Sequence, residues 1–110
     1  MAINSVLISS TDTEALNVPS GKKYAITTLL VCNYATSTNT LNDSTFNMHV
    51  LNGSGDVKSN TNKVLNSVSM PAQETFTWNV ERLILEEGDR VILNSADSDK
   101  LSATISFLEV

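Results

Sequence analysis

The sequence lacks most of the residues from which catalytic, metal-binding and disulfide-stabilised proteins are built. Cys32 is the only cysteine, which excludes an intrachain disulfide, and the apolar run around it is typical of a buried thiol. His49 is the only histidine, so one chain cannot supply several His ligands, and nothing nearby suggests a Ser-His-Asp triad. Four glycines hardly suffice for a phosphate-binding loop in addition to the turns. We therefore expect no enzyme, no cofactor and no metal, and we expect His49 to face solvent or an interface.

Positive charge and long apolar runs are scarce as well. Seven Lys and Arg residues against 12 Asp and Glu residues give a net charge of −5, and only Lys22 and Lys23 are adjacent. Nucleic acids and anionic membrane surfaces bind clustered cations, so we expect neither of them as a partner. No apolar stretch approaches the roughly 20 residues of a membrane-spanning helix, and residues 1–10 lack the pattern of a signal peptide. We expect the protein to be made in the cytoplasm.

The residues that are present favour β-strands. Ser, Thr and Asn make up about a third of the chain, and these side chains disfavour long helices because they compete for backbone hydrogen bonds. Apolar and polar residues alternate along 75–80 and 101–107, which is the period of a strand with one buried face. The predicted strands are 3–9, 14–18, 23–33, 44–51, 63–70, 75–80, 83–85, 90–94 and 101–110.

Turn residues separate most of these strands. The segment from Pro19 to Gly21 can form a tight turn, and Gly88 lies between two acidic residues where the chain should reverse. We expect one domain over residues 1–110, with an all-β fold: a single antiparallel β-sandwich, jelly-roll-like or Ig-like, of about eight short strands. Residues 23–33 are apolar on both faces and predict a central strand. Trp78 is the expected anchor of the core.

Two polar segments, 34–43 and 52–62, do not alternate and predict long loops. Loops of this length are uncommon in small domains unless they bind something or are disordered. They flank the predicted strand 44–51, so they should emerge at its opposite ends as adaptable surfaces. The residues predicted to contact a partner are Tyr34, Thr36, Thr38, Asn39, Asn42, Asp43, Asn52, Ser54, Asp56, Lys58 and Asn60.

Acidic residues gather in two of the turns. Asp97 and Asp99 alternate before the last predicted strand, a pattern that can ligate calcium but lacks the central glycine and the terminal glutamate of an EF-hand loop. Carboxylates that stabilise a turn are the simpler interpretation. We interpret Glu86, Glu87 and Asp89 as solvated charge.

Three segments carry a resemblance to a known class of proteins. The phrases NVPSGKKYAITTLLVCNYA, ERLILEEGDRVILNSAD and LSATISFLEV resemble small β-sandwich virion structural proteins of tailed bacteriophages, most closely those of marine and cyanobacterial phages. The similarity consists of a proline-glycine turn before a long apolar strand, an acidic Gly-Asp turn and a final strand. It extends over nearly the whole chain and offers no functional residue. The resemblance implies a virion β-sandwich without giving its position on the particle.

The expected function is therefore structural. We expect a capsid decoration protein in the virion, bound to a major capsid or tail protein through loops and edge strands. The alternatives are a module of the tail or fibre and a module that binds host glycans through Tyr34. The first and last predicted strands have edges that could extend a neighbour's sheet, which predicts a homo-oligomer, for example a trimer.

Overall fold

The computed structural model describes residues 2–53 and 55–110, apart from the side chains of residues 80–82. The regular secondary structure of the described chain is almost entirely β-strand, with one turn of 3-10 helix inside a loop. Its elements are β1 (Ala2–Ile8), β2 (Thr13–Asn17), β3 (Lys23–Asn33), η1 (Thr40–Asn42), β4 (Ser44–Leu51), β5 (Lys63–Met70), β6 (Thr75–Glu86), β7 (Arg90–Ser95) and β8 (Leu101–Glu109).

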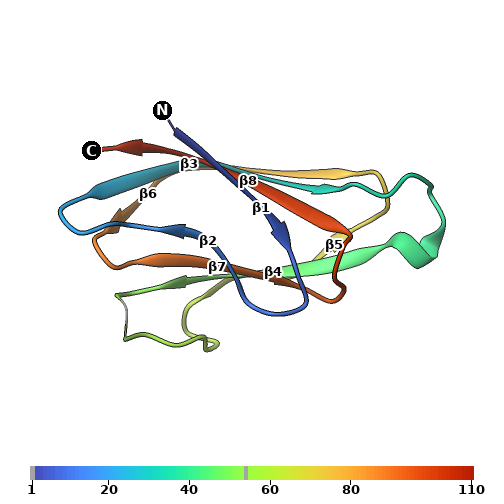
Figure 1. Ribbon diagram of the computed structural model, residues 1–110, viewed down its shortest axis with the longest axis horizontal. Helices are drawn as coiled ribbons and strands as arrows, with labels where there is room; N and C mark the ends of the chain where they lie inside the picture. The colour runs from blue at the N-terminus through green and yellow to red at the C-terminus, as the bar shows by residue number, and fades with distance from the viewer. Residues whose placement is uncertain (1, 54) are drawn as a thin grey trace.

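The strands pair as if one long hairpin had been folded up. β1 pairs with β8, β2 with β7, β3 with β6 and β4 with β5, all antiparallel. Further pairing of β3 with β8 and of β4 with β7 creates two sheets, ordered β1-β8-β3-β6 (the β3 sheet) and β2-β7-β4-β5 (the β4 sheet), which Figure 1 shows as upper and lower layers. This nested pairing is the topology of a jelly roll. The predicted all-β sandwich is confirmed, and of the two predicted topologies the strand order matches the jelly-roll-like one.

The central strand β3 was predicted with its observed bounds, whereas β6 was not. The sequence predicted two separate strands, 75–80 and 83–85, but the structure has one strand of 12 residues. Both halves find partners because β3 is 11 residues long: Thr75–Asn79 and Leu83–Glu86 pair with its two halves. On the other side of β3, Thr27 is an extra residue relative to β8. At this bulge its Oγ1 donates to the Ser106 carbonyl oxygen (3.2 Å).

The core lies between the two sheets and contains few aromatic rings. Phe46 is fully buried and meets Phe76 edge to face, with ring centroids 5.6 Å apart. Trp78 packs against this core but stays partly exposed, because β6 is an edge strand. Phe46 is therefore the buried aromatic anchor, and Trp78, which the sequence predicted in that role, lies at the margin of the core.

The turns fix the ends of an elongated molecule that measures 45 × 28 × 19 Å. Gly21 has φ +77° and closes a turn in which the Lys22 N–H donates to the Pro19 carbonyl oxygen (3.1 Å). Gly88 has φ +86° and reverses the chain between β6 and β7 as predicted. The loops 34–43 and 52–62 leave β4 at opposite ends of the long axis (Figure 1).

Candidate functional site

The residues predicted to contact a partner form two separate groups, one at each end of β4. In the loop 34–43, the predicted residues are exposed except for half-buried Asn42. In the loop 52–62, they are exposed except for half-buried Asp56, and Ser54 lies outside the described residues. We call these two surfaces the 34–43 end and the 52–62 end. The expected placement at opposite ends is confirmed, so no single partner-binding surface unites the two groups.

The 34–43 end is organised around Asn33, the last residue of β3. Its side chain is 1% exposed, and its Nδ2 donates to the carbonyl oxygens of Asn42 (2.8 Å) and Met70 (3.0 Å). Its Oδ1 accepts from the Ala35 N–H (3.1 Å). One uncharged amide thus joins the start of the loop, its end and the neighbouring strand β5. The loop is held by specific bonds, in contrast to the adaptable surface that its composition suggested.

The side chains of several predicted contact residues form hydrogen bonds that hold this loop together. Asn39 caps the 3-10 turn by accepting from the Leu41 N–H (2.9 Å), and Asp43 accepts from the Ala72 N–H (3.0 Å). Asn42 donates to Ser37 Oγ (3.1 Å). These residues shape the surface rather than offering free groups to a partner.

Two apolar side chains project from the 34–43 end. Leu41 is 79% exposed and Tyr34 is 42% exposed. Lys100 connects their backbones: its carbonyl oxygen accepts from the Tyr34 N–H (3.1 Å), and its Nζ donates to the Leu41 carbonyl oxygen (2.5 Å). An exposed aliphatic side chain and an exposed ring on the same loop, both with a hydrogen-bonded backbone, are suitable anchors for a protein partner.

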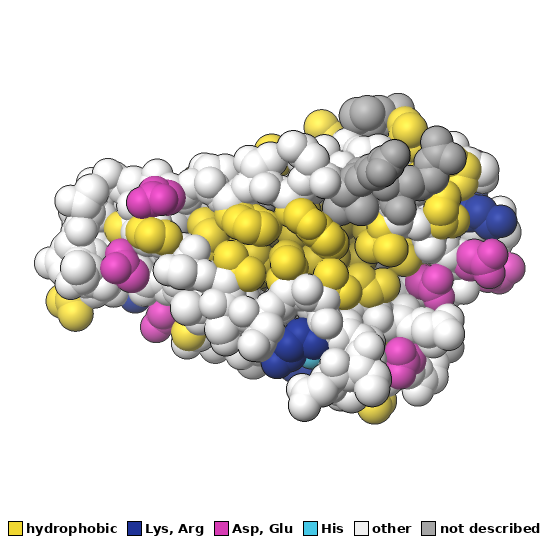
Figure 2. Space-filling view, turned by 180° about the vertical axis from the view of Figure 1, so that it is seen from behind, with side chains coloured by type: hydrophobic (Ala, Val, Ile, Leu, Met, Phe, Trp, Pro, Cys, Tyr) yellow, Lys and Arg dark blue, Asp and Glu magenta, His cyan; other side chains and the backbone are white. Residues whose placement is uncertain are grey.

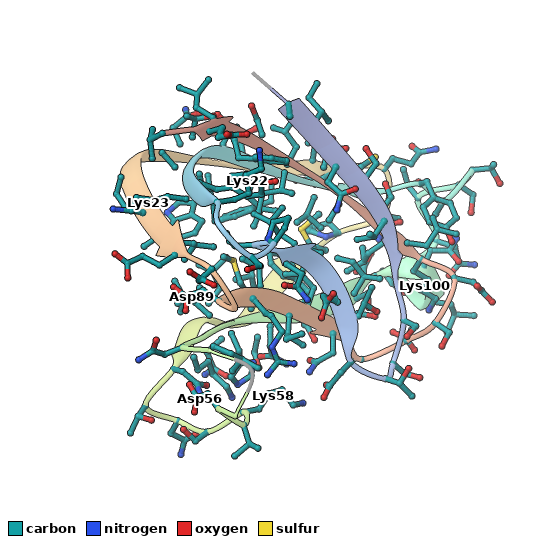
Figure 3. All side chains as sticks on the ribbon, turned by 60° about the vertical axis from the view of Figure 1, so that its left-hand side comes forward. Lys22, Lys23, Asp56, Lys58, Asp89 and Lys100 are labelled. Carbon is teal, nitrogen blue, oxygen red and sulfur yellow. The ribbon has the colours of Figure 1, made fainter. Side chains whose placement is uncertain are left out.

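The 52–62 end is held by charged side chains instead. Asp89, in the turn after β6, accepts from the Gly53 N–H through Oδ1 and from the Glu86 N–H through Oδ2, both at 2.9 Å. The Arg90 Nη2 donates to the carbonyl oxygen of Asp56 (3.0 Å). Figure 3 shows Asp89 facing the loop that carries Asp56 and Lys58. Carboxylate and guanidinium groups of the β6–β7 turn therefore fasten the loop to the sandwich.

Inside this loop, Asp56 supports the local backbone. Its Oδ2 accepts from the Asn52 N–H (3.0 Å) and its Oδ1 from the Val57 N–H (2.9 Å). The bond from the Asn52 backbone lowers the pKa of Asp56 more than any other contact. Asp56 and Asn52, both predicted to contact a partner, are consequently committed to the shape of the loop.

A shallow groove of about 430 Å³ separates this loop from the start of β2. Leu51 and Ile92 contribute apolar surface to it, and the charged side chains of Asp12, Lys58 and Arg90 also line it. Lys58 Nζ lies 2.5 Å from Asp12 Oδ1, and the hydrogen bond from Lys58 is the main cause of a lowered pKa at Asp12. The groove holds opposite charges that already neutralise one another, so it offers little free charge to a ligand.

His49 lies next to this charged cluster and corrects an expectation from the sequence. It was predicted to face solvent or an interface, but it is only 5% exposed, and its Nδ1 has no hydrogen-bond partner among the residues that the structure describes. Burial lowers its pKa, and the nearby cations Lys58 and Lys63 lower it further, while Asp12 opposes them. His49 is therefore a neutral buried side chain on the outer face of the β4 sheet, in a position that a strand pattern alone assigns to solvent.

The acidic turns show no arrangement for a cation. Among residues 2–53 and 55–110, no three His, Cys, Asp or Glu side chains lie close enough together to hold a metal ion. Asp97 accepts from Ser44 Oγ (3.0 Å), and Asp99 adopts φ +63° in the turn. The Asp97 carboxylate thus joins this turn to β4, so the predicted stabilisation within the turn itself stays a prediction. No helix in the described part of the chain is long and apolar enough to cross a membrane.

Sequence reasoning missed the residues that matter most at the two ends. Leu41 and Val57 are 79% and 72% exposed, and each projects from an otherwise polar loop. A lone aliphatic residue in such a loop was the available signal. Asn33 and Asp89, which fasten the loops, gave no signal, because each also bonds to a distant backbone group, at Met70 (37 residues away) and Gly53 (36 residues away) respectively.

Comparisons with known proteins add no relative. The chain matches no protein-family model, and a search of curated proteins finds no significant match.

Proposed function

We propose that this protein is a non-enzymatic structural component of a tailed-phage virion, a decoration protein that docks on the capsid through its 34–43 end. The observation that carries the proposal is the pair of exposed side chains Leu41 and Tyr34 on a loop that is already fixed by Asn33 and Lys100. A loop ordered before binding loses less conformational entropy when it docks, which favours affinity.

The fold is compatible with this role. Jelly rolls recur in viral capsid proteins, although lectins and cupins share the architecture, so the fold alone does not select a function. The 34–43 loop lies at one end of a 45 Å molecule, and the 52–62 loop leaves the opposite end of β4 and folds beneath the lower sheet, where Lys58 pairs with Asp12 (Figure 1). A decoration protein with this shape can hold its 34–43 end on the capsid while its 52–62 loop stays clear of that contact.

The chemistry of the docking surface also suits a protein partner. The loop presents Tyr34 and Leu41 among Ser, Thr and Asn groups. Two charged side chains at this end, Asp43 and Lys100, are already hydrogen-bonded to the backbone. Such a surface can bury apolar area without removing unpaired charges from water, which would be costly. An acidic chain that approached through charged groups would instead depend strongly on salt.

Reconstitution on particles tests the proposal. Purified wild-type chain is added to particles of the encoding phage from which it has been removed, and bound copies are counted by quantitative mass spectrometry. We expect on the order of hundreds of copies per particle, as repeated capsid symmetry requires. A handful of copies would exclude a decoration role and favour the tail or the fibre.

The variant Leu41→Asp tests the docking surface itself. It should weaken binding by at least about tenfold, or ~1.4 kcal/mol, because it places a charge in an apolar contact. The matched control Val57→Asp introduces the same charge in place of the exposed aliphatic residue at the other end, and it should bind within about twofold of wild type (~0.4 kcal/mol). Equal binding of Leu41→Asp and wild type would rule out docking through the 34–43 end.

A glycan-binding role is the second candidate, because Tyr34 is an exposed ring at the start of a loop rich in Asn and Thr. Aromatic faces with neighbouring amides are common in sugar sites. In that case Tyr34→Ala would abolish signals on a glycan array, while Leu41→Asp would preserve them. An array without any signal for the wild-type chain would eliminate this role.

A further inference from the structure

The two sides of the sandwich are closed to different degrees. On one side the edge strands β1 and β2 lie against each other, and Asn4 bridges the sheets by donating from Nδ2 to the Ala15 carbonyl oxygen (2.5 Å). On the other side the edge strands β5 and β6 make almost no contact with each other along the described chain. Figure 2 shows an apolar strip between the two layers on this second side. We call it the open seam.

Side chains of the core form the open seam. Each of them packs against the buried cluster and remains partly exposed, which is unusual for residues that point into a sandwich. They come from both sheets. The described members are Val50, Leu65, Val68, Phe76, Trp78 and Leu83.

The strands along the seam carry no charge over most of their length. No charged residue occurs in 64–70 of β5 or in 75–79 of β6. A solvated β-edge is normally protected by charge, proline or a bulge. β5 has such protection, since its register with β4 shifts twice and Ser67 adopts φ +48°. Residues Thr75–Asn79 of β6 have none of these features: they pair regularly with β3 on one side and leave the other edge unpaired.

We infer that the open seam is the surface through which copies of this chain associate. The inference does not depend on the proposed capsid role, because the seam and the 34–43 end are different surfaces. A second copy is the occupant that the seam fits, since its uncharged apolar strip is matched in character by the same strip on another chain in a symmetric contact. A charged peptide or a polar ligand would leave groups unpaired against it.

The area of the seam is sufficient for such a contact. β5 has eight residues, and at roughly 3.3 Å per residue the seam is about 25 Å long. Packed sheets lie ~10 Å apart and each edge strand adds ~5 Å, so the face is about 20 Å wide and about 500 Å² in area. Two copies would bury about 1,000 Å² in total, which reaches the lower bound for a specific interface.

Trp78 is the only tryptophan of the chain and lies in the seam, so it reports on the contact directly. Sedimentation equilibrium of the wild-type chain at micromolar concentration should give a multiple of the 11.9 kDa chain mass. Dilution to the monomer should shift the Trp78 emission to the red as the ring becomes exposed. A chain that remains monomeric at high concentration would overturn the inference, as would dissociation without any change in emission.

Substitutions then locate the contact. Leu65→Lys places a charge in the seam on the β5 side and should raise the dissociation constant of the oligomer at least about 100-fold, or ~2.7 kcal/mol. Leu7→Lys introduces the same charge at a residue of β1 that is 65% exposed on the closed side, and it should leave the oligomer intact. Circular dichroism confirms that each variant is folded, and if Leu65→Lys unfolds, Trp78→Gln replaces it. A folded seam variant that associates like wild type would refute the inference.

Discussion

The loops at the two ends of β4 have similar length and composition but are held in different ways. The 34–43 loop depends on the uncharged, buried amide of Asn33, with Lys100 adding one bond near the surface. The 52–62 loop depends on Asp89, Arg90 and the Lys58–Asp12 pair, all half-buried or exposed. Polar sequence in a loop therefore does not determine how the loop is stabilised; the burial of its anchor does.

This difference has a measurable consequence. Bonds between uncharged buried groups respond weakly to pH and salt, whereas exposed charged pairs are screened and titrate. The 34–43 end should therefore keep its shape over a wide range of solution conditions. The 52–62 end should loosen first when the solution becomes acidic or salty.

The largest effect is expected for Asn33→Ala. Loss of the amide removes one buried and two partly buried hydrogen bonds to the backbone, which should cost about 2–3 kcal/mol in the free energy of unfolding. Urea unfolding at pH 7 measures it. The control Asn42→Ala removes only an exposed side-chain bond to Ser37 and should cost less than about 0.5 kcal/mol. A similar loss of free energy of unfolding for both variants would show that the burial of Asn33 does not determine its contribution to stability.

Asp89→Asn should have the next largest effect. Only one oxygen remains to accept from Gly53 or Glu86, and the new NH₂ group faces the other N–H donor, so we expect a loss of about 1–2 kcal/mol. Amide hydrogen exchange should accelerate in 52–62 and stay unchanged in 34–43. The matched change Asp97→Asn keeps an oxygen that can accept from Ser44 and should have a smaller effect. Faster exchange in both loops would contradict separate anchoring.

A smaller effect should appear as a pH dependence caused by His49. Because burial lowers its pKa below 6.5, the unfolded chain takes up a proton first as the solution is acidified. Stability is thus complete above pH 6.5 and declines as the pH falls below that value. The lowered pKa values of Asp12 and Asp56 add a further loss only below their usual value of 3.8.

The variant His49→Gln isolates this contribution, since glutamine does not titrate. The midpoint temperature of thermal unfolding should decline between pH 7 and pH 5 for the wild type and stay nearly level for the variant. An equally steep decline in both would assign the pH dependence to other groups.

The smallest effect is expected for Lys58→Met. Its ion pair with Asp12 is largely solvent-exposed, and pairs of this kind contribute about 0–1 kcal/mol. The loss should shrink as salt is added, because the pair is then screened in the wild type as well. Lys22→Met, which breaks an exposed pair with Glu109 far from the loop, should not change hydrogen exchange in 52–62.

The fold was largely predictable because alternation and turn residues report local geometry. The strands 23–33, 44–51 and 63–70 were predicted with their observed bounds. The predictions of a break in β6 and of an exposed His49 were both wrong because each outcome depends on a segment distant in sequence. The continuity of β6 depends on the long strand β3, and the burial of His49 depends on the loop and charges beside the β4 sheet. The loop positions followed from the strands, but their anchors did not, since the bonds of Asn33 and Asp89 reach across the fold.

The nested pairing of the strands also constrains how the chain reaches this structure. Ala2 pairs with Phe107, and β8 is the shared neighbour of β1 and β3. During synthesis β1 emerges early and waits for its partner until β8 has been translated, so the β3 sheet cannot close before then. Contacts so distant in sequence make folding slow, on the order of milliseconds to seconds. Until β8 arrives, β1 and β3 have unsatisfied edges, and chaperones that shield such edges would raise the yield of folded protein.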